Sequence, residues 1–105
     1  MQIYDLSDDV QAVFAFYTRH HSVQPTDDRF VPKLNLEVGE LTQAYLARPG
    51  QARDKGRTSA DFEQDFRSES ADVLAQVLLI ARWFDVDLAE GVARKWLATE
   101  PAAGL

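Results

Sequence analysis

Apolar residues recur at intervals of three and four along most of the chain, which is the spacing of an amphipathic helix. The first such segment predicts a helix from about Asp8 to His21, with Ser7 as a plausible N-cap. Its apolar face consists of Val10, Val13, Phe14, Tyr17 and His21. Because helix-breaking residues follow at Pro25 and Pro32, the next helix is expected to start near the first of them.

The second and third helices are predicted on either side of Pro49 and Gly50. The second runs from about Asp27 to Ala47, and Thr26 can cap it. The third runs from Ser59 or Ala60 to Phe84, and residues 71–81 are apolar almost all round. A helix that is apolar on every side is buried on every side, so we expect this one at the centre of an assembly.

A fourth helix is expected from about Leu88 to Ala98, where Asp87 and Glu90 resemble a capping box. No segment shows the period of two that a bounded strand requires. Four helices in a chain of 105 residues indicate an all-α fold class, with residues 1–105 as a single domain built as a helical bundle.

Composition and charge narrow the possible partners. The net charge is −6 and the eleven Lys and Arg residues are scattered, whereas a nucleic-acid-binding protein normally has a basic face. We therefore expect no nucleic acid as partner. The start of the chain is unlike a signal peptide, and the longest apolar stretch is too short to span a membrane. A cytoplasmic protein with no membrane partner is the expectation, and the absence of cysteine excludes thiolate metal sites.

Glu37 and Glu40 carry the strongest chemical signal. Residues three apart in a helix lie on one face, so the two carboxylates point the same way beside the apolar stripe. Gly39 lies between them and has no packing role in the helix that the pattern predicts.

Glu69 and Asp72 repeat this spacing at the start of the apolar stretch of the third helix. No Lys or Arg lies three or four residues from Asp72, and a charge beside a core is costly unless it is paired or bound to metal. Either pair alone is typical of a solvated helix face. If the two helices pack together, however, the four carboxylates form an oxygen-rich site of the kind that Mg²⁺ prefers.

These two pairs, within KLNLEVGELTQAYL and ESADVLAQVLLIARWFDVDL, resemble the MazG-like all-α nucleoside triphosphate pyrophosphohydrolases. The resemblance covers about residues 30–97, and E-x-x-E on one helix with E-x-x-D on the next is the family's mark. It implies that Glu37, Glu40, Glu69 and Asp72 bind Mg²⁺, with Glu37 or Glu40 activating water.

The same resemblance implies contacts between lysines and the substrate. Lys33 and Lys95 match positions where members of the family often carry lysine, although a solvent-exposed role is equally typical of such residues. Arg53 and Lys55 lie in the predicted loop and can fold over phosphates, although a soluble loop is the commoner case. Leu36 departs from the family pattern, because many relatives have glutamate there. The number of metal ions therefore stays open.

The resemblance predicts hydrolysis of a nucleoside triphosphate to the monophosphate and pyrophosphate. A pyrophosphatase acting on dUTP or phosphoribosyl-ATP is the alternative within the enzyme class. A non-catalytic helical interaction module on the same fold is the alternative outside it. Because one short chain has too few helices to cover the third, we expect a bundle completed by a homodimer, or by a tetramer of two dimers.

Overall fold

The computed structural model describes residues 2–47 and 58–98, and every regular element in these ranges is a helix. The expected all-α class is therefore confirmed for the described chain. The helices are α1 (Ile3–His20), α2 (Asp27–Leu46), α3 (Ser59–Trp83) and α4 (Leu88–Val92), which continues into a π-helical segment, η1 (Ala93–Leu97). None of these helices is long and apolar enough to cross a membrane.

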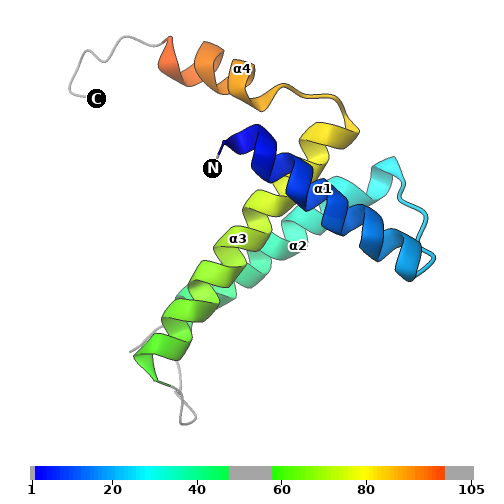
Figure 1. Cartoon of the computed structure of the whole chain (residues 1–105). Helices are drawn as coiled ribbons and strands as arrows, with labels where there is room; N and C mark the ends of the chain where they lie inside the picture. Colours follow the sequence, from blue (N-terminus) through cyan, green and yellow to red (C-terminus); the bar gives the residue numbers. More distant parts are fainter. Residues whose placement is uncertain (1, 48–57, 99–105) are drawn as a thin grey trace.

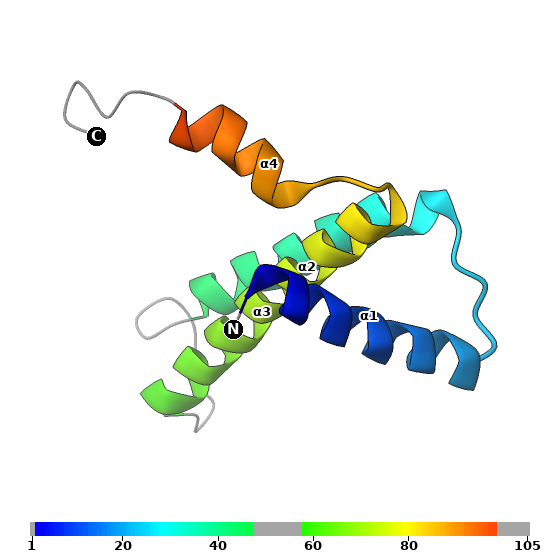
Figure 2. The same cartoon turned by 45° about the horizontal axis from the view of Figure 1, so that its top comes forward.

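The centre of the molecule is the pair formed by α2 and α3, which lie side by side and run in opposite directions (Figure 1). Helix α1 crosses this pair and packs mainly on α3. Helix α4 and η1 extend away from the pair at the end where α3 stops (Figure 2). The long α2–α3 contact therefore sets which side chains of these two helices meet.

A small aromatic cluster joins the three long helices. Phe30 of α2 is buried, and its ring lies 5.8 Å from that of Phe14 in α1 and 4.7 Å from that of Trp83 in α3. Leu78 and Leu79 of α3 complete the adjoining core. The radius of gyration is 17.1 Å, whereas a compact chain of about 100 residues has about 13 Å. A single chain thus leaves much apolar surface uncovered.

The predicted start of the first helix was wrong. Helix α1 begins at Ile3, and Ser7 is buried inside it instead of capping it. Ile3 and Leu6 continue the three-and-four spacing toward the N-terminus, so they extend the apolar face. The Arg82 guanidinium binds the Asp8 carboxylate at 2.6 Å, which fixes the first turns against α3.

The start of α3 is set by a complete capping box. The Asp61 amide donates to the Thr58 hydroxyl at 3.1 Å, and the Thr58 amide donates to the Asp61 carboxylate at 2.9 Å. Thr26 occupies the N-cap position of α2 as expected, but its side chain accepts no hydrogen bond from the helix. Pro32 lies inside α2, which begins at Asp27 as predicted.

The end of α3 and the start of α4 form one tight turn. Asp85 has a positive φ of 57°, and the Val86 amide donates to the Ala81 carbonyl at 2.8 Å, which closes α3 as a Schellman-type cap. The Asp87 carboxylate then accepts the Glu90 amide at 3.0 Å. The Glu90 side chain binds Arg94 instead of returning to the cap, so the expected capping box is only half formed.

Helix α3 is not covered on every side within one chain. Leu78 and Leu79 are buried, but Leu74 is 45% exposed and Asp72 is exposed. The expectation that α3 is buried on every side is therefore not met within the single chain. The Asp72 carboxylate lies at the solvent-facing edge of the apolar stretch, where hydration is retained.

Candidate metal centre

The α2–α3 pair brings three glutamates together. Each of Glu37, Glu40 and Glu69 offers a carboxylate oxygen, and these three oxygens all lie within 4.8 Å of one another. The first two come from adjacent turns of α2 and the third from the facing turn of α3. We call this group the carboxylate cluster; it contains residues from both of the pairs found in the sequence.

Glu37 is the most deeply placed member, with 6% of its surface exposed. One of its oxygens, Oε1, lies 3.1 Å from the Lys33 ammonium one turn earlier in α2. Its other oxygen, Oε2, and the Oε2 atom of Glu69 are both buried without a hydrogen-bond partner among the described residues. A buried carboxylate oxygen without a partner is costly, so the single ammonium of Lys33 leaves the cluster short of positive charge and donors.

The pKa of Glu69 also reflects the excess of negative charge at the cluster. This pKa is raised, first by desolvation and then by the negative charges of Glu40, Asp72, Glu37 and Asp65. Asp65 and Asp72, on the same helix as Glu69, therefore add their negative charge to that of the two glutamates of α2. Asp65 was not singled out from the sequence, because its four-residue spacing to Glu69 is common on solvated helix faces.

The donor set fits a hard divalent cation. All three ligands are carboxylate oxygens, and no histidine or cysteine belongs to the group. Mg²⁺ is bound in proteins by a few carboxylates together with water and substrate phosphates. A cation among these oxygens would supply the partner that Glu37 and Glu69 lack and would oppose the upward shift of the Glu69 pKa.

Asp72, the fourth predicted ligand, lies outside this group of three. It is exposed one turn after Glu69, and its charge acts on Glu69 at short range. The single chain thus brings three of the four predicted acids into one cluster and places the fourth beside it.

The predicted substrate-binding cations have separate positions. Lys33 is half-exposed on α2 and ion-paired with Glu37. Lys95 is exposed on η1, which extends away from the α2–α3 pair (Figure 2). Arg53 and Lys55 lie outside the described residues. Within one chain, the structure therefore brings Lys33 to the carboxylate cluster and leaves Lys95 apart from it.

A cavity of about 640 Å³ lies between α1, α2 and α3. Its apolar wall includes Val13, Phe14 and Tyr17 from α1, and its charged side chains are Asp9 from α1 and Arg29 and Lys33 from α2. The volume is typical of small-molecule sites. Sequence reasoning identified the α1 side chains only as a core face, because the cavity depends on how far α1 opens from α2.

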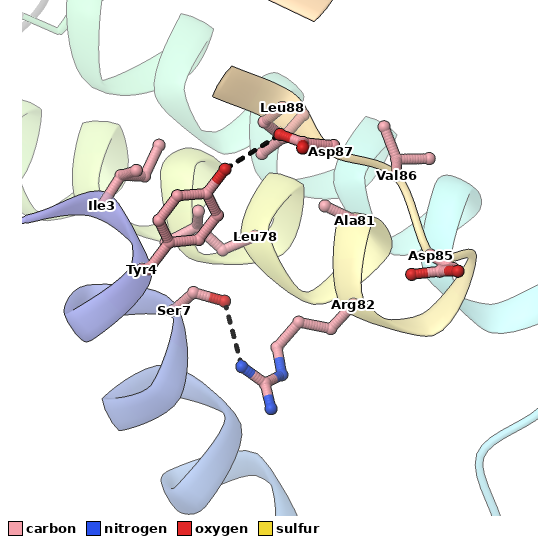
Figure 3. Close-up of a pocket in the computed structure, with 10 residues that line it drawn as sticks. All are labelled: Ile3, Tyr4, Ser7, Leu78, Ala81, Arg82, Asp85, Val86, Asp87 and Leu88. Carbon is pink, nitrogen blue, oxygen red and sulfur yellow. Dashed lines mark hydrogen bonds between the residues drawn. The ribbon is translucent and has the colours of Figure 1, made fainter. Parts of the chain in front are cut away.

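A second cavity, of about 560 Å³, lies where α1 meets the α3–α4 turn (Figure 3). The Tyr4 hydroxyl crosses it and donates to the Asp87 carboxylate at 2.9 Å, while Arg82 contacts Ser7. The Asp87 carboxylate accepts hydrogen bonds from the Glu90 amide and from Tyr4, and these lower the pKa of Asp87. The hydrogen bond to Asp87 in turn raises the pKa of Tyr4. These polar groups satisfy one another, so this junction has a structural role in joining α1 to α4.

Comparison with models of protein families, with curated protein sequences and with solved structures gives no match. Among the described residues, the carboxylate cluster combines buried, unpartnered acidic oxygens with an adjoining cavity and a nearby cation.

Proposed function

We propose that the protein is a Mg²⁺-dependent nucleotide pyrophosphohydrolase that cleaves a nucleoside triphosphate to the monophosphate and pyrophosphate. The observation that carries this proposal is the pair of buried carboxylate oxygens, on Glu37 and Glu69, that have no partner in a cluster of three acids. The resemblance of the two acidic pairs to the MazG-like all-α pyrophosphohydrolases supplies the reaction class.

Glu37, Glu40 and Glu69 would hold Mg²⁺, with Asp72 as the neighbouring fourth acid. The bound cation would neutralise phosphate charge and lower the pKa of a coordinated water. An acidic protein can bind a polyanion in this way, because the negative surface is offset where the substrate binds.

Glu40 is the better candidate for the general base. Glu37 is buried and already ion-paired with Lys33, whereas Glu40 is exposed at the same cluster and can reach a water molecule. In this step the water oxygen attacks the α phosphorus as Glu40 accepts the water proton. The bond between the α phosphorus and its bridging oxygen breaks, and pyrophosphate leaves.

Positive side chains would hold the phosphates. Lys33 lies beside the cluster and is the first of these, and Arg29 lines the same cavity one turn earlier in α2. Lys95 is a candidate that a second chain would have to bring closer, so we propose a homodimer or a tetramer as the active assembly; Arg53 and Lys55, outside the described residues, remain candidates as well.

Hydrolysis in ¹⁸O-labelled water tests the bond that is broken. We expect Mg²⁺-dependent release of pyrophosphate, with the label in the nucleoside monophosphate. Glu40→Gln should lower kcat by about 10²- to 10⁴-fold, the range for loss of a general base. Glu90→Gln on α4, outside the carboxylate cluster, is the matched control and should keep activity.

The substrate screen should include ATP, dUTP and phosphoribosyl-ATP, because these separate the alternatives within the enzyme class. Label in free inorganic phosphate together with nucleoside diphosphate would reject attack at the α phosphorus. A folded protein that releases no pyrophosphate from any of these nucleotides would favour a non-catalytic interaction module.

A further inference from the structure

Lys33 belongs to two neighbouring features of the molecule. Its ammonium lies 3.1 Å from Oε1 of Glu37, and its side chain also lines the cavity between α1, α2 and α3. Arg29, Lys33, Glu37 and Glu40 follow one another along one face of α2 at spacings of four, four and three residues. This face is therefore basic beside the cavity and acidic at the carboxylate cluster.

The Lys33 side chain can serve either feature, because it is half-exposed and ends a flexible four-carbon stem. At the cluster it contacts only one oxygen of Glu37 and leaves the buried oxygens of Glu37 and Glu69 without partners. One ammonium thus neutralises the cluster incompletely. A divalent cation that bound the same acids would satisfy more oxygens and would repel Lys33 at short range.

We propose that Lys33 is an exchangeable counter-ion: it pairs with Glu37 in the metal-free protein and turns into the α1–α2–α3 cavity when a divalent cation binds. This inference rests on the metal site of the proposed function. Asp9, Arg29 and Lys33 are the charged side chains that line this cavity, so an ammonium released from Glu37 adds net positive charge there.

Coupling between the two sites follows from this exchange. In the metal-free protein, an anionic ligand with an apolar body would meet Arg29 and a Lys33 ammonium that is still paired with Glu37; in the metal-bound protein it would meet Arg29 and the released ammonium. Binding of metal and binding of ligand then favour each other, and the coupling is reciprocal. Lys33 acts here as a positioning residue that orders the binding of the two ligands.

Chemical labelling tests the movement of Lys33 directly. The protein is treated briefly with an amine-acetylating reagent, with and without Mg²⁺, and the modification of each lysine is read by mass spectrometry. We expect Mg²⁺ to increase acetylation of Lys33 severalfold while Lys95 on η1 changes little. In Glu69→Gln, which loses a cluster acid, the same Mg²⁺ concentration should have a much smaller effect.

Mn²⁺ affinity, measured by electron paramagnetic resonance, tests the competition. Lys33→Met should bind Mn²⁺ about fivefold or more tightly than the wild type, the lower end of ordinary coupling between sites. Lys33→Arg keeps the internal cation and should not gain affinity. Arg29→Met removes a charge one turn further away and should change the affinity by less than Lys33→Met does.

The outcomes separate this inference from the function on which it rests. If the wild type binds Mn²⁺ but Lys33 labelling is unchanged by metal, or Lys33→Met binds metal no more tightly, the exchange is wrong and the metal site stands. If the wild type binds no Mn²⁺ at millimolar concentration, both the metal site and the exchange are wrong.

Discussion

At the scale of single residues, the Glu69 carboxylate lies among like charges. Its Oε2 atom is buried without a partner, and desolvation together with four neighbouring acids raises its pKa above the ordinary value of 4.5. An acid with a raised pKa binds more protons in the folded than in the unfolded protein. Stability is therefore lost as the pH rises from that ordinary value through the higher folded value.

Replacing Glu69 by glutamine should consequently stabilise the metal-free protein at neutral pH. Thermal melting in EDTA should give a higher Tm for Glu69→Gln at pH 7, and the difference should disappear below about pH 4.5, where both states are protonated. With Mg²⁺ present, the order should reverse, because the variant loses a ligand.

Asp72→Asn is the matched control at the exposed edge of the cluster. It should change the stability of the metal-free protein by about 0.5 kcal/mol or less, as for most surface substitutions. A lower Tm for Glu69→Gln in EDTA at pH 7 would mean that the Glu69 carboxylate is already favourably paired without metal.

At the scale of elements, two helices begin after a threonine, but only one of these threonines makes a cap hydrogen bond. Thr58 and Asp61 bind each other's backbone amides at the start of α3, whereas Thr26 at the start of α2 makes no such bond. Both positions have a residue that favours helix N-caps. The cap at Thr26 was predicted from the sequence and that at Thr58 was not, and the backbone geometry at each start decides which one forms a hydrogen bond.

The two caps should differ in energy. Thr58→Ala should lower the free energy of unfolding by about 1 kcal/mol, the usual cost of losing a bonded cap. Thr26→Ala should change it by only a few tenths of a kcal/mol, because no cap bond is lost. Urea denaturation followed by circular dichroism would measure both, and equal losses would show that Thr26 also caps its helix in solution.

At the scale of the whole molecule, the open arrangement leaves large apolar side chains in water. Leu74 lies on the apolar stretch of α3 yet is 45% exposed, and Val13 and Phe16 of α1 are exposed as well. Extended apolar surface of this kind marks sites of association. A second chain packed on α3 would cover the stretch that the sequence suggests should be buried.

We accordingly expect a mass of about twice the 11.8 kDa of one chain, or four times if dimers pair, in light scattering at micromolar concentration. Leu74→Glu should shift the protein toward the monomer, because it places a charge in the proposed interface. Gln64→Glu, at an exposed polar position of the same helix, should leave the mass unchanged. A wild-type mass near 12 kDa would contradict this assembly.

The apolar pattern was sufficient to predict the helices in their order and to place each acidic pair on one face of its helix. Periodic apolar spacing defines which face of a helix is buried, and three-residue spacing places two side chains on that helix's same side. These local rules were sufficient to predict α2 and α3 closely, and to predict that Glu69 would face Glu37 and Glu40 once the two helices packed.

Other features of the fold and of the site arose only from tertiary packing. The true start of α1 depends on contacts with α3 and the α3–α4 turn, and the cavity depends on the angle at which α1 crosses the pair. The exposure of Asp72 and the pairing of Lys33 with Glu37 depend likewise on which neighbours surround each side chain. Helical periodicity fixes directions around one axis, but distances between axes arise only when the helices pack.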